Sequence, residues 1–165
     1  MNDQLTHKKA LLYARIAGVL YLVIIVCAGF SEGFVRSSLV VPADAAATAA
    51  NIIESEGLFR LGLVSDLIAF MSDAVVAVLF YQLLKPVSQT LSLVAAALRL
   101  LAHPAIGSLN LLNHYAALKM AGGEGILTAF ETGQLQSWSL LFMDFHGIGY
   151  IIAGAFFGLH CLILG

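Results

Sequence analysis

Four long apolar runs, separated by short polar segments, dominate the pattern of the chain. They predict transmembrane helices at residues 11–31, 58–84, 87–120 and 137–165. Each run has at least the ~20 residues that a helix needs to cross the hydrocarbon core of a bilayer. The pattern therefore predicts an all-α fold, a polytopic transmembrane helix bundle with four spans that form one domain over residues 1–165.

Proline and glycine mark the ends and one interruption of these runs. Lys85-Pro86 ends the second run, because proline disfavours helical backbone at the residue before it. Pro104 removes a backbone hydrogen bond inside the third run and predicts a kink there. Gly122-Gly123 ends this run. The second and third spans therefore form a tight antiparallel hairpin.

A short helix is expected at residues 43–56, between the first two spans. Asp44 is placed to cap its N-terminus. Ile52 and Ile53 lie beside the polar residues Asn51 and Glu54, a mixture that suits a helix lying in the membrane interface. We expect this interfacial helix in the first outer loop.

Composition agrees with a membrane protein and excludes one class of partner. Hydrophobic residues make up 60% of the chain and charged residues 11%, whereas a soluble domain has about a quarter charged residues. The net charge of -2 and the absence of a basic run argue against a nucleic-acid partner. The lipid bilayer is the expected environment, whereas homo-oligomerisation and a small-molecule ligand stay open.

The basic residues that flank the spans predict the orientation. Positive side chains favour the cytoplasmic face, and the basic flank of the first helix usually dominates. We therefore expect a multi-pass protein of the cell membrane with a cytoplasmic N-terminus. The basic residues expected inside are Lys8, Lys9, Arg15 and Lys85, and those expected outside are Arg36, Arg60 and Lys119.

Two opposite charges are expected to meet within the membrane. Asp73 lies about as far before the Lys85-Pro86 turn as Arg99 lies after it. In an antiparallel hairpin of helices with 1.5 Å rise per residue, the two side chains reach nearly the same depth. An Asp73–Arg99 ion pair, with a structural role, is the sharpest structural prediction.

The same symmetry predicts a second polar layer nearer the outer surface. Asp66 lies two helical turns before Asp73 on the same face of its helix. The last span brings further polar side chains to a similar depth, and Glu32 of the first span could join the rim. The candidate polar site comprises Asp66, His103, Asn110, Asn113, Asp144 and His146.

Several roles for this layer stay open. Interhelical hydrogen bonds that fix helix register are the leading interpretation. A divalent metal bound by Asp66, His103, Asp144 and His146 would make the protein a membrane-embedded metal-dependent hydrolase, but Asp144 and His146 point about 200° apart on a straight helix. A chain of Asp and His would also suit an ion- or proton-coupled small-molecule carrier. The remaining hypothesis is a haem group with two axial histidines, chosen from His103, His114, His146 and His160.

No recognisable catalytic motif accompanies these residues. The chain has no nucleotide-binding glycine loop, nucleophile elbow or zinc-protease motif. Cys27 and Cys161 are expected to be isolated, inert thiols. The sequence predicts no catalytic residue and leaves the identity of any cofactor or metal open. It predicts an integral membrane protein of unknown biochemical role.

Several segments resemble one family of bacterial integral membrane proteins. They are Ala14–Leu22, Glu32–Arg36, Val40–Pro42, Asp44–Ile52, Glu56–Gly62, Leu84–Val87, Asn110–Asn113 and Phe157–His160. With these the chain resembles the family called domain of unknown function 4386. The resemblance implies a bacterial inner-membrane protein, assigns no catalytic residue, and suggests a shortened member or a fragment, because family members are expected to carry about two further helices.

Overall fold

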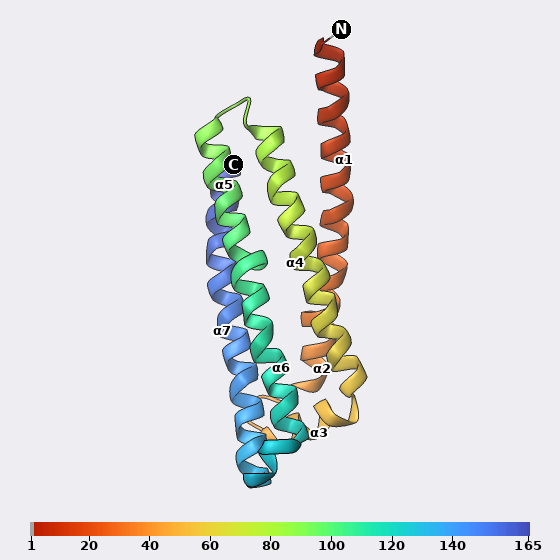
Figure 1. Cartoon of the computed structure of the whole chain (residues 1–165), viewed down its shortest axis with the longest axis vertical. Helices are drawn as coiled ribbons and strands as arrows, with labels where there is room; N and C mark the ends of the chain where they lie inside the picture. The colour runs from red at the N-terminus through yellow and green to blue at the C-terminus, as the bar shows by residue number, and fades with distance from the viewer. Residues whose placement is uncertain (1) are drawn as a thin grey trace.

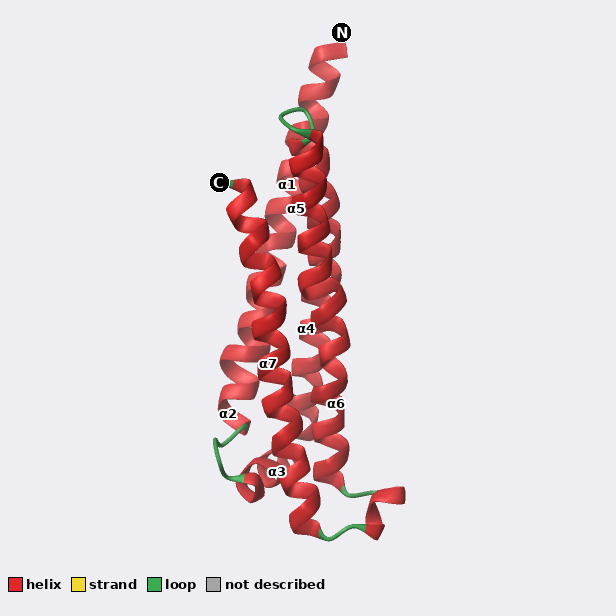
Figure 2. Cartoon of the chain, turned by 90° about the vertical axis from the view of Figure 1, so that its left-hand side faces the viewer, coloured by secondary structure: helices red, strands yellow, loops and turns green. Residues whose placement is uncertain are grey.

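The long helical segments run side by side along the long axis of the molecule (Figure 1), and four of them are candidate membrane spans. The computed structural model describes the backbone from residue 2 and the side chains from residue 7. His7–Leu39, Glu56–Leu84, Gln89–Gly122 and Thr132–Leu164 are each long and apolar enough to cross a membrane. The described part of the chain contains helices, turns and loops without strands (Figure 2). The predicted all-α bundle with four membrane-spanning helices is confirmed.

The helices differ in length from the predicted spans, most of all the first. It comprises α1 (Asn2–Ala28), the π-helical segment η1 (Gly29–Arg36) and α2 (Ser37–Leu39), and so continues well past residue 31. The helix widens in η1, a stretch that includes Gly29, Ser31 and Gly33, without ending there. The consequence is that Arg36, expected in an outer loop, lies within the helix.

The second and third long segments form the expected hairpin. The second is α4 (Glu56–Leu84). The third comprises α5 (Gln89–Leu100), the π-helical segment η2 (Leu101–Gly107) and α6 (Ser108–Gly122). Pro104 lies inside η2, where its missing N–H cannot support a regular α-turn. Short π-helical insertions are frequent at functional sites.

The fourth segment, α7 (Thr132–Leu164), begins earlier than residue 137. Glu131 and Gln134 form a capping box at its start, which satisfies backbone N–H groups that would otherwise lack a partner. The short 3-10 helix η3 (Gly125–Ala129) precedes it. Gly123 has φ 60° and ends α6 in the left-handed conformation that glycine adopts without strain.

A short helix, α3 (Ala45–Glu54), occupies the connection between the first two long segments. The Asp44 Oδ1 atom caps it by accepting a hydrogen bond from the Ala47 N–H at 2.9 Å. Ala49 and Ile52 are buried, and α3 packs against α6 and α7 at one end of the bundle (Figure 2). The predicted helix is thus present, and its position in the membrane interface stays a prediction.

Polar side chains are buried inside the bundle, and many large apolar ones face outward. On α1, for example, Val19, Leu22, Ile25 and Val26 are each more than 60% exposed. The buried polar residues include Arg36, Asp66, Asp73, Arg99, His114, His146 and His160. In lipid, where apolar contact alone gives little drive for helix association, such interior polar contacts help to hold helices together.

The two ends of the bundle provide reference points for the site. The α3 end carries α2, α3 and η3, and the Lys85 end carries the turn between α4 and α5 (Figure 1). The N-terminus and the C-terminus both lie toward the Lys85 end (Figure 1).

Candidate functional site

The buried polar residues form two centres around two arginines. The Arg99 centre comprises Arg99, Asp73, Tyr21, His103 and His160. Arg99 Nη2 donates to Asp73 Oδ1 at 2.5 Å, and its Nη1 donates to the Tyr21 hydroxyl at 2.5 Å. His103 Nδ1 lies 3.3 Å from the second Asp73 oxygen, and His160 Nε2 lies 3.0 Å from Arg99 Nη1. The contacts join all four long segments.

Aromatic rings enclose the Arg99 guanidinium. Its central carbon lies 4.7 Å from the ring centre of Tyr21, 5.5 Å from that of Phe80 and 5.1 Å from that of Phe157. The faces of these rings attract a cation, and they do so more strongly where water is absent. Arg99 and Asp73 are at most 1% exposed, so the pair is held in a dry, low-dielectric environment.

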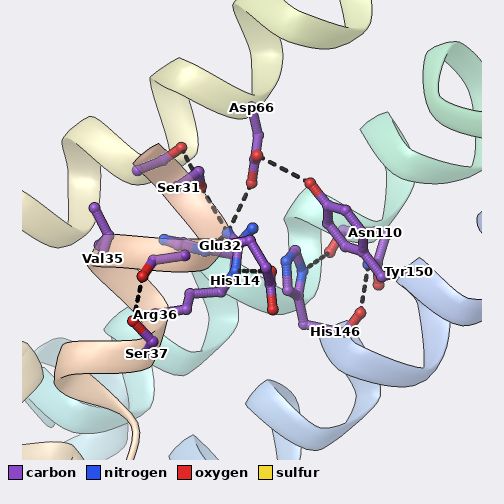
Figure 3. Close-up of polar contacts among 12 residues, drawn as sticks. Ser31, Glu32, Val35, Arg36, Ser37, Asp66, Asn110, His114, His146 and Tyr150 are labelled. Carbon is purple, nitrogen blue, oxygen red and sulfur yellow. Dashed lines mark hydrogen bonds and ion pairs between the residues drawn. The ribbon is translucent and has the colours of Figure 1, made fainter. Parts of the chain in front are cut away.

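The Arg36 centre lies nearer the α3 end and comprises Arg36, Asp66, Glu32, Ser31, Tyr150, His114, Asn110 and His146 (Figure 3). Arg36 Nη1 donates to Asp66 Oδ2 at 2.7 Å and to Ser31 Oγ at 2.9 Å. Arg36 Nε donates to Glu32 Oε2 at 2.6 Å. The Tyr150 hydroxyl donates to the other Asp66 oxygen at 2.9 Å. Both oxygens of the buried Asp66 carboxylate are therefore engaged.

Each centre also contains a histidine that is fixed by a backbone carbonyl. His114 Nε2 lies 3.0 Å from the carbonyl oxygen of Phe59, and His160 Nδ1 lies 2.8 Å from that of Ala95. A carbonyl oxygen only accepts hydrogen bonds, so these ring nitrogens are the donors. The other ring nitrogen of each histidine is then free to accept from the arginine of its centre, at 3.4 Å for His114 and 3.0 Å for His160.

His146 is paired on one side of its ring alone. Its Nδ1 lies 3.1 Å from the Asn110 carbonyl oxygen, and the Asn110 side-chain amide donates back to the His146 carbonyl at 2.7 Å. Its Nε2 is buried and has no hydrogen-bond partner among the described residues. Arg36 Nη2 and Arg99 Nε are likewise buried and have no hydrogen-bond partner among the described residues. A buried polar atom without a partner costs ~1–3 kcal/mol, so each requires an explanation.

Two of these three unpartnered atoms belong to residues that line one pocket. The pocket has a volume of about 220 Å³ and lies between the η1–α2 segment and α7. Figure 3 shows the Arg36 guanidinium and the His146 ring pointing toward one another from these two elements. The pocket is lined by Glu32, Arg36, Ser37, Val40, Met143, Asp144, His146 and Gly147.

The structure divides the six residues of the predicted polar site. Asp66, Asn110 and His146 lie in the Arg36 centre, and the Asn113 amide donates to Asn110 Oδ1 at 2.9 Å. His103 lies with Asp73 in the Arg99 centre, away from the layer assigned to it. The Asp144 side chain is exposed and borders the pocket.

The four metal ligands considered from the sequence are not brought together. Asp66 contacts Arg36 and Tyr150, whereas His103 contacts Asp73. Asp144 and His146 point in opposite directions from the last span, as expected. Asp144 is exposed and His146 is buried. Among the described residues there is no group of three or more His, Cys, Asp or Glu side chains that could hold a metal ion.

Sequence reasoning missed Arg36 as the partner of Asp66. Arg36 was counted as a loop charge because the helix was expected to end near residue 31. A signal was available, because Glu32 and Arg36 are spaced i and i+4, the separation at which opposite charges pair on a helix. Tyr150 and Tyr21 were also missed, since a tyrosine in an apolar run carries no separate signal for a polar partner.

Comparison with known proteins places the chain in one family. No curated protein and no solved structure matches it. A family model described as Domain of unknown function (DUF4386) matches residues 16–165, which include every residue of the two arginine centres. The chain therefore belongs to the DUF4386 family, as the sequence resemblance indicated.

Proposed function

We propose that this membrane protein binds a small polar molecule in the pocket beside Arg36, and that the Arg99 centre has a structural role. The proposal divides the buried polar residues between two tasks. Most of them fix the register of the helices, and the few that line the pocket bind the ligand.

The unpartnered atoms at the pocket carry this proposal. Polar residues with a purely structural role are expected to form hydrogen bonds with one another and to leave no cavity. An unmade hydrogen bond in a low-dielectric interior is costly. Arg36 Nη2 and His146 Nε2 depart from this expectation, and the residues that carry them border the same 220 Å³ pocket. The two atoms are themselves buried, so a ligand in the pocket reaches them after a small movement of the side chains around them. A bound molecule with a hydrogen-bond acceptor and a donor would satisfy both atoms.

The dense pairing within the Arg99 centre supports a structural role. Asp73, Tyr21 and His160 engage the two terminal nitrogens of Arg99, and three rings cover its guanidinium. Arg99 does not border the 220 Å³ pocket. Its one unpartnered atom, Nε, therefore does not belong to the residues that line the proposed ligand pocket.

A second candidate function, proton-coupled transport, has one observation in its favour. A cavity of about 40 Å³ lies between the two centres and is bordered by Asp73, His103 and Tyr150. A water needs ~10–15 Å³ of such space, so this cavity has room for at least one. Water there would connect Asp73 and His103 with Tyr150, whose hydroxyl donates to Asp66. Proton flux into liposomes that contain the protein, lost in His103→Phe, would support this candidate; its absence would remove it.

The metal-dependent hydrolase considered from the sequence receives no comparable support. Both oxygens of Asp66 are occupied by Arg36 and Tyr150, so a metal would have to displace an ion pair and a hydrogen bond. We therefore do not extend the proposal to hydrolysis.

We further propose a location in the cell membrane with a cytoplasmic N-terminus. Lys85 and the basic N-terminal flank lie at the same end of the bundle, as expected from the sequence. Arg36 is 5% exposed and paired, so it no longer counts as a loop charge at the α3 end. Arg60 and Lys119 remain there, which strengthens the bias of basic residues toward the Lys85 end.

The experiment compares two glycines on the same face of α7. Gly147 borders the pocket, and a Cβ at Gly147 or at Gly154 would meet no atom within 4 Å. Gly147→Leu should fill the pocket, whereas Gly154→Leu, two turns away, should not. Binding of ethylammonium, methyl phosphate and O-phosphoethanolamine to the detergent-purified chain is measured by titration calorimetry.

At least one of these probes should bind to the wild type and to Gly154→Leu, and should be lost in Gly147→Leu. If no probe binds to the wild type, or if Gly147→Leu binds equally well, the proposed function is wrong. The choice among the three probes then identifies the charge of the ligand.

A further inference from the structure

The charges around the pocket favour a ligand that contains a cation. Arg36 is the one positive group among the charged residues of the Arg36 centre and the pocket lining, and Asp66 and Glu32 already contact it. Asp144 adds a third carboxylate, which makes no ion pair or hydrogen bond to another described residue. A purely anionic ligand would meet this excess of negative charge, whereas a positive group would be attracted to it.

The unpartnered atoms require an acceptor as well as a donor on the same ligand. Arg36 Nη2 carries hydrogens and cannot accept, so it needs an acceptor, and a cationic donor forms its strongest hydrogen bonds with an anionic oxygen. His146 donates from Nδ1 to Asn110, which leaves Nε2 as an acceptor that needs an N–H or O–H group. A single ligand that satisfies both atoms therefore carries an anionic oxygen at one end and an N–H or O–H donor at the other.

We propose that the pocket binds a zwitterion in which a primary or secondary ammonium group lies a few bonds from an anionic oxygen. This inference rests on the proposed function of the pocket. The anionic oxygen accepts from Arg36 Nη2. The ammonium group donates to His146 Nε2, and the exposed Asp144 at the rim of the pocket attracts it through its charge without touching it.

The size and place of the pocket agree with a small headgroup. Its volume of about 220 Å³ is below the ~300 Å³ at which pockets for drug-sized molecules begin. It lies between two membrane-spanning segments, and Val40 and Met143 give it an apolar border. The same ammonium–oxyanion chemistry occurs in the headgroup of phosphatidylethanolamine and in free molecules such as O-phosphoethanolamine, and the experiment separates these two sources.

The first arm uses soluble probes with the detergent-purified chain. Phosphocholine has the same charges as O-phosphoethanolamine but has no N–H to donate, and methyl phosphate lacks the cation. O-phosphoethanolamine should bind at least ~10-fold more tightly than either, which corresponds to the loss of one charge-assisted hydrogen bond. Asp144→Asn should weaken its binding, whereas Glu54→Gln, which removes an exposed carboxylate outside the pocket, should not.

The second arm uses lipid. Native mass spectrometry compares retention of dioleoylphosphatidylethanolamine with that of dioleoylphosphatidylcholine, in the wild type and in Gly147→Leu. Selective retention of the ethanolamine lipid, lost in Gly147→Leu, identifies a lipid headgroup. Selective binding of the soluble probe without lipid retention identifies a free molecule, and either result supports the proposed ligand class.

Other results overturn the inference and separate it from the proposed function. Equal binding of phosphocholine or methyl phosphate, lost in Gly147→Leu, would show that the pocket binds a ligand of another class. Binding of O-phosphoethanolamine that is unchanged in Asp144→Asn would contradict the assigned ammonium position. Absence of binding for every soluble and lipid probe would contradict both proposals.

Discussion

Replacing Asp73 by leucine should strongly destabilise the bundle. Leucine has a similar size but removes the negative charge that Arg99 contacts at 2.5 Å. Arg99 is fully buried, so its charge would lose its counterion in a region from which water is excluded. His103 would lose its hydrogen-bond partner in the same step.

The size of the effect follows from the burial of the pair. Removing one partner of a buried ion pair costs ~3–5 kcal/mol, because the other charge is left uncompensated. An ordinary interhelical hydrogen bond in a membrane protein contributes ~0.6 kcal/mol on average. The aromatic rings and Tyr21 still stabilise Arg99, so we expect a loss near ~3 kcal/mol, at the lower end of the first range.

The assay is reversible unfolding in mixed micelles of a mild detergent and dodecyl sulfate, followed by circular dichroism. Arg99→Met in the same chain as Asp73→Leu should recover most of the loss, since an apolar pair of similar volume replaces the ion pair without a stranded charge. Glu56→Gln is the control, because the Glu56–Arg60 pair is about half exposed and its loss should cost less than ~1 kcal/mol. A loss below ~1 kcal/mol for Asp73→Leu, or no recovery in the double variant, would refute the reasoning.

Three further outcomes follow from the structure. Gly149→Ala should destabilise the bundle by ~1–3 kcal/mol, because the new Cβ would overlap the Asn110 amide, whereas Gly147→Ala meets no atom and should not; equal stabilities in the same unfolding assay would contradict this packing. Asp44→Ala should cost ~1 kcal/mol by removing the cap of α3, and hydrogen exchange should rise in that helix alone; unchanged exchange would argue against the cap. Lys85→Cys should react with an impermeant thiol reagent from the cytoplasmic side of the membrane; labelling from the opposite side would reverse the proposed orientation.

The fold could be predicted because lipid imposes strong constraints on sequence. Four apolar runs of sufficient length can cross a bilayer only as helices or closed barrels, and their length excludes short barrel strands. The hairpin at Lys85-Pro86 then placed Asp73 and Arg99 at one depth, and they are in contact in the structure. Regular helices of known rise make depth predictable from counting alone.

The Arg36 centre was harder to predict because it depends on departures from regular helix geometry. η1 carries Arg36 on a π-helical segment, whose wider turns are not indicated by the periodicity of the sequence. η2 contains His103, which lies beside Asp73 and not beside Asp66. Depth could be counted from the turn, but the direction of a side chain around a distorted helix could not.

The central claim is that the space beside Gly147 is a polar pocket that holds a ligand, and thiol accessibility tests it most directly. Single cysteines replace Gly147 or Ile148 in a Cys27→Ala, Cys161→Ala background; Ile148 lies at nearly the same depth, is exposed and does not border the pocket. A cationic methanethiosulfonate reagent should modify Gly147→Cys much faster than Ile148→Cys, and O-phosphoethanolamine should slow that reaction. Equal rates at the two positions would contradict the claim of a polar pocket, and no protection by O-phosphoethanolamine at Gly147→Cys would contradict the proposed class of ligand.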